Sequence, residues 1–178
     1  MGIQLKKIVF LFVFLLGLLL SPAPPLAESS ILEVCFTPGE NCTGALVKGL
    51  REARSSILVQ AYSFTSAPIA KALTEAHKRG VHVEVILDKS QRKEKYTSAD
   101  FVAHAGILTY IDTEHAIAHN KVMVIDGETV ITGSFNFTKA AQEKNAENLL
   151  VIRDKALAAQ YSDNWHLHQK HSEIYRGK

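Results

Sequence analysis

Hydrophobic positions along this chain form short β-branched runs that alternate with stretches of helical spacing. The runs ILVQAY at 57–62 and VHVEVIL at 81–87 have the length and composition of strands. Between them, Ser66 precedes a helical pattern and Gly80 follows it, which predicts a helix with Ser66 as its cap. The same patterns predict strands at 31–36, 107–111, 121–125, 129–132 and 148–152, and helices at 46–53, 98–105, 138–141 and 154–171. The opening order of strand, helix, strand, helix, strand favours parallel pairing. We therefore expect an α/β fold, an α-β-α sandwich around a central mixed, largely parallel sheet.

The first residues have the pattern of a targeting signal. Lys6 and Lys7 precede an apolar run at 8–20, and a proline-rich break follows it. This run is shorter than the ~20 residues that span a bilayer, so we expect a secretory signal at 1–27, cut after Ala27. A single domain at 28–178 would then be exported, to the periplasm or the medium. The alternative interpretation is an uncleaved membrane anchor.

Charge narrows the range of partners. The chain has 20 Lys and Arg against 18 Asp and Glu, and the predicted signal contains two of the lysines and no acid. The remaining domain is therefore balanced, and bulk charge gives no support for nucleic-acid binding. A local excess of basic residues occurs in the loop at 88–96 (DKSQRKEKY), after a predicted strand, where ligands of α/β sheets tend to bind. Such a loop is usually only solvated, and contact with a polyanion is the alternative.

The two cysteines, Cys35 and Cys42, flank strong turn chemistry at 37–41. In an oxidising compartment an even number of cysteines favours pairing, so we expect a disulfide, with two free thiols as the alternative. A metal site made by these two cysteines alone lacks further ligands at suitable spacing.

The candidate chemistry is concentrated in HNKVMVIDGETVITGSFN at 119–136. His119 and Lys121 are two residues apart, so in a strand they would project from the same face. Asp126 and Gly127 predict a hairpin turn, after which Ser134 and Asn136 follow the returning strand. An imidazole, an ammonium, a hydroxyl and a carboxamide in one neighbourhood indicate a phosphate site.

The spacing His119-x-Lys121-x4-Asp126, followed by Gly-Ser-x-Asn at 133–136, resembles the HxKxxxxD signature and the GSxN element of the phospholipase D superfamily. The segments CFTPGENCT, QAYSFT and AENLLVI extend the resemblance across nearly the whole domain. The chain is most similar to the small, single-motif, exported endonuclease branch. This resemblance implies a phosphodiesterase that needs no metal and no other cofactor.

The resemblance also implies roles for individual residues. His119 would attack phosphorus and form a phosphohistidine, and Lys121 would neutralise charge on a non-bridging oxygen. Ser134 and Asn136 would donate hydrogen bonds to the same oxygens. Glu147 falls where the family places a carboxylate that orients the nucleophilic imidazole.

Asp126 belongs to the catalytic signature, but its position favours a structural role. It is an odd number of residues from His119, so an ideal strand would point it to the opposite face. It also occupies a turn, where aspartate is common for local reasons.

The eight histidines raise a metal alternative. His115 and His119 have zincin spacing, but the sequence HAIAH lacks the glutamate and leads into a strand. His166, His168 and His171 are interpreted as a solvated face of the last helix. We therefore expect no metal site.

One copy of the motif supplies one histidine, whereas the superfamily reaction uses two. Single-motif members are implied to form a homodimer with a shared site, since a two-fold interface repeats one motif. The leading hypothesis is an endonuclease that takes DNA as its nucleic-acid partner, with RNA left open as a second substrate, and that has no stable membrane association after signal cleavage. The alternatives are a phospholipase D acting on head groups and a non-catalytic nucleic-acid-binding or lipid-binding module.

Overall fold

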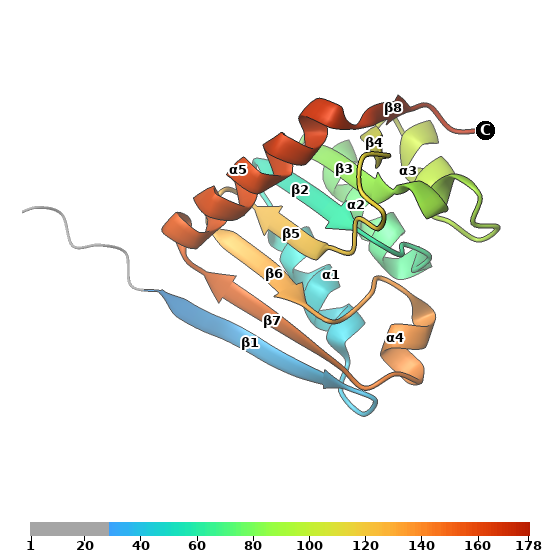
Figure 1. Cartoon of the computed structure of the whole chain (residues 1–178). Coiled ribbons are helices and arrows are strands. Elements are labelled where there is room, and N and C mark those ends of the chain that lie inside the picture. The colour runs from blue at the N-terminus through green and yellow to red at the C-terminus, as the bar shows by residue number, and fades with distance from the viewer. Residues whose placement is uncertain (1–28) are drawn as a thin grey trace, which may run out of the picture.

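One eight-stranded sheet forms the centre of the structure, a computed structural model that describes residues 29–178 (Figure 1). The predicted signal at 1–27 lies outside the described residues. The strand order is β1-β7-β6-β5-β2-β3-β4-β8. The strands are β1 (Ser30–Thr37), β2 (Ser56–Ala61), β3 (His82–Asp88), β4 (Leu108–Asp112), β5 (Lys121–Ile125), β6 (Thr129–Gly133), β7 (Glu147–Arg153) and β8 (Glu173–Tyr175). The helices are α1 (Cys42–Glu52), α2 (Ala67–Lys78), α3 (Ala99–His104), α4 (Lys139–Glu143) and α5 (Lys155–His171), with a 3₁₀ turn η1 (Lys89–Arg92).

The sheet is mixed, as predicted, but it is not largely parallel. Within the described chain, β2–β3 and β3–β4 are the parallel pairs, and the other five neighbouring pairs are antiparallel. The parallel pairing favoured by the opening order of elements holds for β2 with β3 but not for β1, because β3 and β5 occupy both sides of β2 and β1 lies at the sheet edge against β7. The short turn between β5 and β6 makes that pair antiparallel.

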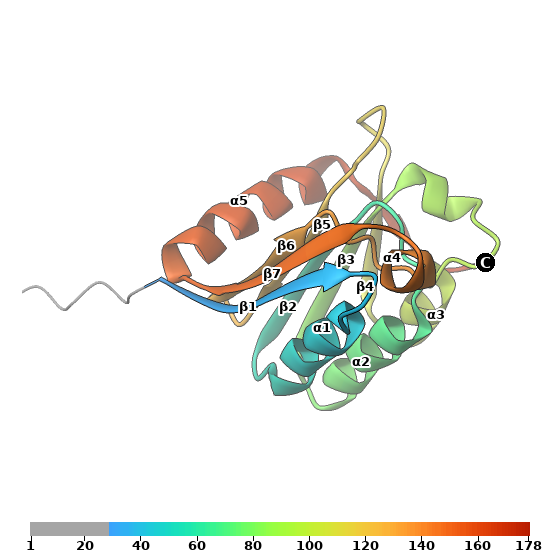
Figure 2. The ribbon, with the colours of Figure 1, turned by 90° about the horizontal axis from the view of Figure 1, so that it is seen from below.

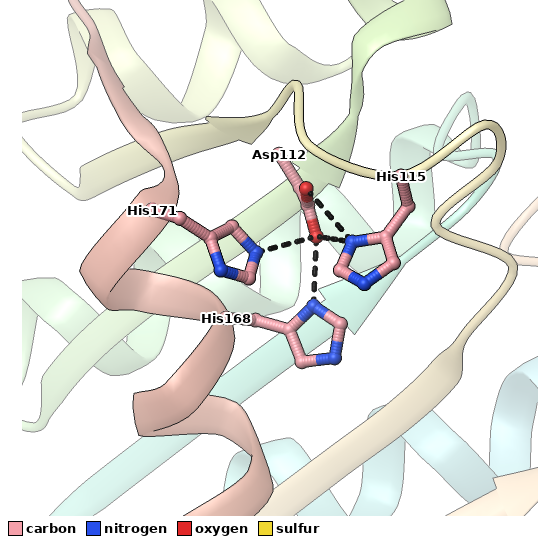
Figure 3. Close-up of side chains that lie close together, drawn as sticks. All are labelled: Asp112, His115, His168 and His171. Carbon is pink, nitrogen blue, oxygen red and sulfur yellow. Dashed lines mark hydrogen bonds and ion pairs between the residues drawn. The ribbon is translucent and has the colours of Figure 1, made fainter.

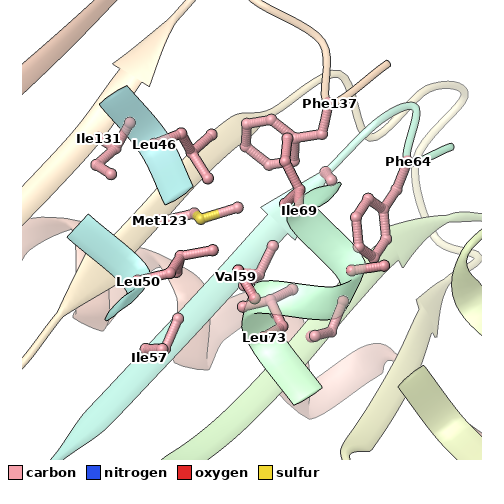
Figure 4. Packing of buried hydrophobic residues seen from close by; sticks show 14 of the residues in the cluster. Leu46, Leu50, Ile57, Val59, Phe64, Ile69, Leu73, Met123, Ile131 and Phe137 are labelled. Carbon is pink, nitrogen blue, oxygen red and sulfur yellow. The ribbon is translucent and has the colours of Figure 1, made fainter. Parts of the chain in front are cut away.

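Helices cover both faces of the sheet, which confirms the α-β-α sandwich. Figure 2 shows α1 and α2 on one side and α5 on the other. Side chains of β2 alternate between the layers: Ile57 and Val59 pack against α1 and α2 (Figure 4), whereas Leu58 joins the cluster under α5. Trp165 of α5 is buried in that second cluster and donates its indole N–H to the carbonyl of Val59 at 2.8 Å.

Local signals placed most element ends correctly. Thr138 and Asp154 accept backbone N–H bonds at the starts of α4 and α5, as helix caps do. Ser66 is the N-cap residue of α2, as predicted, although its side chain makes no cap hydrogen bond. The short edge strand β8 was not predicted, since three residues carry too little periodicity to be recognised.

The predicted disulfide is present. Cys35 of β1 and Cys42 at the start of α1 are bonded, with their Cα atoms 5.5 Å apart. The bond joins the edge strand to the helix that packs beneath it. Among residues 29–178, no helix has the length and apolarity to cross a membrane.

Candidate active site

The polar residues of the motif gather where the central strands β5, β6 and β7 begin or end, at one end of the sheet. Lys121 begins β5, Gly133 ends β6 and Glu147 begins β7. These three strands are antiparallel neighbours, so the start of one lies beside the end of the next. The hairpin therefore brings both halves of the signature to the same place.

His119 lies just before β5 rather than within it, so the expected strand alternation with Lys121 does not apply. The Lys121 ammonium turns back and donates to the backbone carbonyl of His119 at 2.7 Å. Tyr62, which follows β2, brings the two side chains together. Its ring centroid lies 4.6 Å from the His119 ring and 5.2 Å from Lys121 Nζ. The His119 side chain is exposed at this end of the strands.

Lys121 is a cation in a partly dehydrated place. Its residue surface is 7% exposed. Burial lowers the pKa of Lys121, while the nearby negative charge of Glu147 acts in the opposite direction. A buried ammonium attracts an anion more strongly than one in water, because little solvent screens it.

Ser134 and Glu147 form the other half of the site. The Ser134 hydroxyl donates to Glu147 Oε2 at 2.6 Å and accepts the backbone N–H of Asn148 at 3.1 Å. Gly133 makes this close approach possible, since a Cβ there would lie 2.3 Å from the Asn148 carbonyl oxygen. This contact explains the glycine of the Gly-Ser-x-Asn element.

Glu147 does not contact His119 in the way that the resemblance implied. Its hydrogen bonds come from Ser134 and from Asn145, whose carboxamide donates at 3.0 Å. Asn136 lies on the segment after Ser134, and its buried Oδ1 has no hydrogen-bond partner among residues 29–178. The Asn136 carboxamide oxygen therefore keeps unused acceptor capacity in this part of the molecule.

Asp126 lies at the far end of the hairpin, five residues beyond Lys121 and thus roughly 17 Å along the strand. Its carboxylate accepts the backbone N–H groups of Arg54, Ser55 and Ser56 and the Ser55 hydroxyl, at 2.7–3.1 Å. This geometry agrees with the structural role that its turn position favoured, and the carboxylate lies away from the polar residues at the other end of the hairpin.

Two of the C-terminal histidines are not a solvated helix face. His168 and His171 turn toward Asp112, together with His115 from the loop before His119. His166 is exposed and stays outside this group. No sequence pattern indicates this cluster, because its members come from β4, a loop and α5.

The matching family model is described as "Cardiolipin synthase, PLD-like domain", and it matches residues 46–167 of the 178. The chain belongs to the phospholipase D superfamily. A phospholipase D of Rickettsia typhi is 45% identical over 142 residues, covering 80% of this chain and 69% of the relative. The human mitochondrial cardiolipin hydrolase is 32% identical over 139 residues, covering 78% of this chain and 55% of the relative.

Solved structures agree with this assignment. Nuc from Salmonella typhimurium, a phospholipase D family member, is 36% identical with a TM-score of 0.81, covering 84% of this chain and all of that one. NucT from Helicobacter pylori, at 24% identity and a TM-score of 0.77 over 83% of this chain and all of its own, shares the fold. As a phospholipase D superfamily member, the chain is a phosphodiesterase of the hydrolase class.

Tyr62 is the site residue that sequence reasoning missed. A single aromatic residue after a strand is unremarkable by itself. What could have indicated Tyr62 is its position directly after β2, because β2 pairs with β5 opposite the start of the motif.

Proposed function

We propose that this superfamily member is a metal-independent endonuclease that hydrolyses DNA, and also RNA, through a phosphohistidine on His119. An exposed basic and aromatic segment, residues 93–96, supports this choice of substrate. It follows β3 at the same end of the sheet as the motif. Phosphate chemistry alone fits several phosphodiesters, whereas this segment suits a polyanion that displays bases.

The basic loop divides into structural and free cations. Lys89 donates to the His115 carbonyl at 2.7 Å, and Arg92 forms an ion pair with Glu173, so both help to hold the fold. Lys93 and Lys95 are exposed, and the Lys95 ammonium lies 5.4 Å from the ring centroid of Tyr96. Tyr96 is 72% exposed. Exposed rings among cations support binding of single-stranded nucleic acid, because bases stack on the ring and phosphates pair with the cations.

The proposed reaction has two displacements at phosphorus. An imidazole nitrogen of His119 attacks the phosphodiester, a P–N bond forms, and the bond to the leaving oxygen breaks as a second histidine protonates that oxygen. Water, deprotonated by the second histidine, then breaks the P–N bond and releases a phosphomonoester. Lys121 neutralises charge on the non-bridging oxygens, and the Asn136 amide N–H donates to them. Ser134 donates to the same oxygens by exchanging its hydrogen bond to Glu147.

We propose a symmetric homodimer as the source of the second histidine. Val34 and Phe36 of β1 are 45% and 57% exposed, although they lie on an apolar face of the sheet. Helix α5 packs over β2, β4, β5 and β6. The part of this face that β1 forms lies beside the helix and is the surface where we propose that a second copy binds. Phe36 is in register with Asn148, next to the Ser134 group, so a second copy bound here would lie beside the site.

The dimer is tested with Phe36→Lys, using Ile174→Lys as the control, since Ile174 is equally exposed on the opposite edge strand. We expect light scattering to show a dimer for the parent and the control, and a folded, inactive monomer for Phe36→Lys. An active monomer at assay concentration contradicts the shared site.

The activity is tested by incubating the purified protein with plasmid DNA in excess EDTA. We expect cleavage by the parent and by His82→Ala, and a loss of at least about 10³-fold in His119→Ala, since the nucleophile is removed. His82 is a suitable control because it lies at the opposite end of β3 from the basic loop. Absence of DNA cleavage together with head-group release from phospholipid would overturn the nuclease assignment. A phosphate adduct trapped on serine would overturn the phosphohistidine.

A phospholipase D is the second candidate, because the Rickettsia typhi relative bears that name and the human relative is named a cardiolipin hydrolase. The site residues serve this reaction equally well, so the same assay with phospholipid vesicles separates the two. We also propose that the protein is exported. The Cys35–Cys42 disulfide supports this, since such bonds persist in oxidising compartments.

A further inference from the structure

Three histidines surround one buried carboxylate beside the loop that carries His119 (Figure 3). Asp112 ends β4 and its side chain is fully buried. Its Oδ2 lies 2.7 Å from His168 Nδ1, 3.2 Å from His115 Nδ1 and 3.3 Å from His171 Nε2. One candidate ligand atom from each of the four residues lies within 4.8 Å of all the others.

Hydrogen bonds alone do not satisfy this arrangement. Three imidazole nitrogens lie within 3.3 Å of Asp112 Oδ2, and His115 Nδ1 is equally close, at 3.2 Å, to Oδ1, which also accepts the Glu114 backbone N–H. His171 Nε2 is buried and makes no hydrogen bond within the described chain, despite its short distance to the carboxylate. A buried nitrogen without a partner costs free energy, and a bound cation would use its lone pair.

We propose that Asp112, His115, His168 and His171 form a structural site for a divalent transition metal of the zinc class. Three imidazole nitrogens and one carboxylate oxygen are a ligand set that Zn²⁺ accepts in tetrahedral geometry. At bond lengths of 2.0–2.1 Å, two tetrahedral ligands are about 3.4 Å apart. The distances of 2.7–3.3 Å from Asp112 Oδ2 to the three imidazole nitrogens are close to this value. The candidate ligand atoms lie up to 4.8 Å apart, so small movements of the imidazole rings toward one another would complete the tetrahedral shell.

The site would be closed and would lie outside the catalytic machinery. Four protein ligands fill a tetrahedral shell, which is typical of structural zinc rather than of a catalytic ion. The ligands come from the end of β4, from the loop 113–120 and from the last turn of α5, so the ion would fasten these three segments together. The same loop is also held by Asp88, which accepts the Ala118 N–H at 2.8 Å. His119 and Lys121 are not ligands, and cleavage in EDTA remains the expectation.

The test is titration of the purified protein with Zn²⁺ after EDTA treatment and desalting, followed by calorimetry and by thermal unfolding. We expect one Zn²⁺ per chain and, at a free Zn²⁺ concentration of 100 Kd, a rise in Tm of roughly 5–10 °C. His168→Ala and His171→Ala should lose both effects. His166→Ala should keep both, since His166 is on the same helix but outside the cluster.

Binding that persists at one equivalent in both cluster variants, or no Zn²⁺ binding by the parent, overturns the site. Unfolding of the variants in the absence of metal is checked by circular dichroism. If a variant does not fold, Co²⁺ added to the parent decides the question, because its visible spectrum reports nitrogen and oxygen ligands in tetrahedral geometry. An octahedral spectrum contradicts the proposal. None of these readouts depends on nuclease activity, so the two proposals fail separately.

Discussion

The two ends of the β5–β6 hairpin carry residues of the same signature in opposite conditions. At the site end, the His119 side chain is exposed, Lys121 is a buried cation without a hydrogen-bonded carboxylate, and Asn136 Oδ1 has no partner among the described residues. At the turn end, both carboxylate oxygens of Asp126 accept hydrogen bonds from the segment that begins β2. One end keeps bonding capacity for a ligand, and the other uses it within the fold.

This difference shows how a sequence motif combines two kinds of requirement. Asp126 adopts φ +55° in the turn and fastens the hairpin to the chain between α1 and β2. Since β2 pairs with β5, this fastening fixes the strand whose other end presents Lys121. A signature residue can therefore serve the site from a distance, through the register of two strands.

The largest difference between the two ends should appear in the rate of cleavage. Lys121→Met removes the buried cation while keeping an unbranched side chain, so we expect kcat to fall about 10²–10³-fold because charge on the phosphate is no longer neutralised. The free energy of unfolding should change by less than about 1 kcal/mol, since burial already disfavours the ammonium. Steady-state cleavage and urea unfolding measure the two quantities. Lys155→Met, at the exposed start of α5, is the control. A fall of less than tenfold would remove Lys121 from the chemistry.

At the turn end, the effect should be on stability. Asp126→Ala removes the acceptor for three backbone N–H groups and forces alanine into a positive φ, so we expect a loss of about 2–3 kcal/mol in the free energy of unfolding. Cleavage per folded molecule should stay within about threefold of the parent. Glu128→Gln, in the same turn, is the control and should be nearly neutral. A large loss of kcat in fully folded Asp126→Ala protein would contradict the division between the two ends.

The smallest effect should be seen in the pH dependence of that stability. Burial acts to raise the pKa of Asp126, but hydrogen bonds from Ser56, Ser55 and Arg54 outweigh it and lower the pKa. The stabilisation is therefore complete above the unfolded pKa of about 3.9 and is lost as pH falls through the lower folded value. Asp126→Asn cannot titrate, so the difference in Tm between the parent and this variant should shrink below about pH 4. A difference that is independent of pH would contradict the assignment.

Local features were predictable because neighbouring residues encode them. The Asp126–Gly127 turn, the Cys35–Cys42 disulfide and the cap at Asp154 each depend on side chains within a few positions of one another. The edge position of β1 was not predictable in this way, since its partner β7 lies more than a hundred residues along the chain.

The sequence by itself determined the chemistry of this protein: the hairpin, the signature residues His119 and Lys121 and, through them, the superfamily. The tertiary structure decided which residues share a neighbourhood. It placed Tyr62 between the two signature side chains, moved Asp126 to the far end of the hairpin and brought His168 to Asp112 across 56 positions. The physical reason is that residue type and local periodicity are read within one element, whereas proximity follows from the order of strands in the sheet.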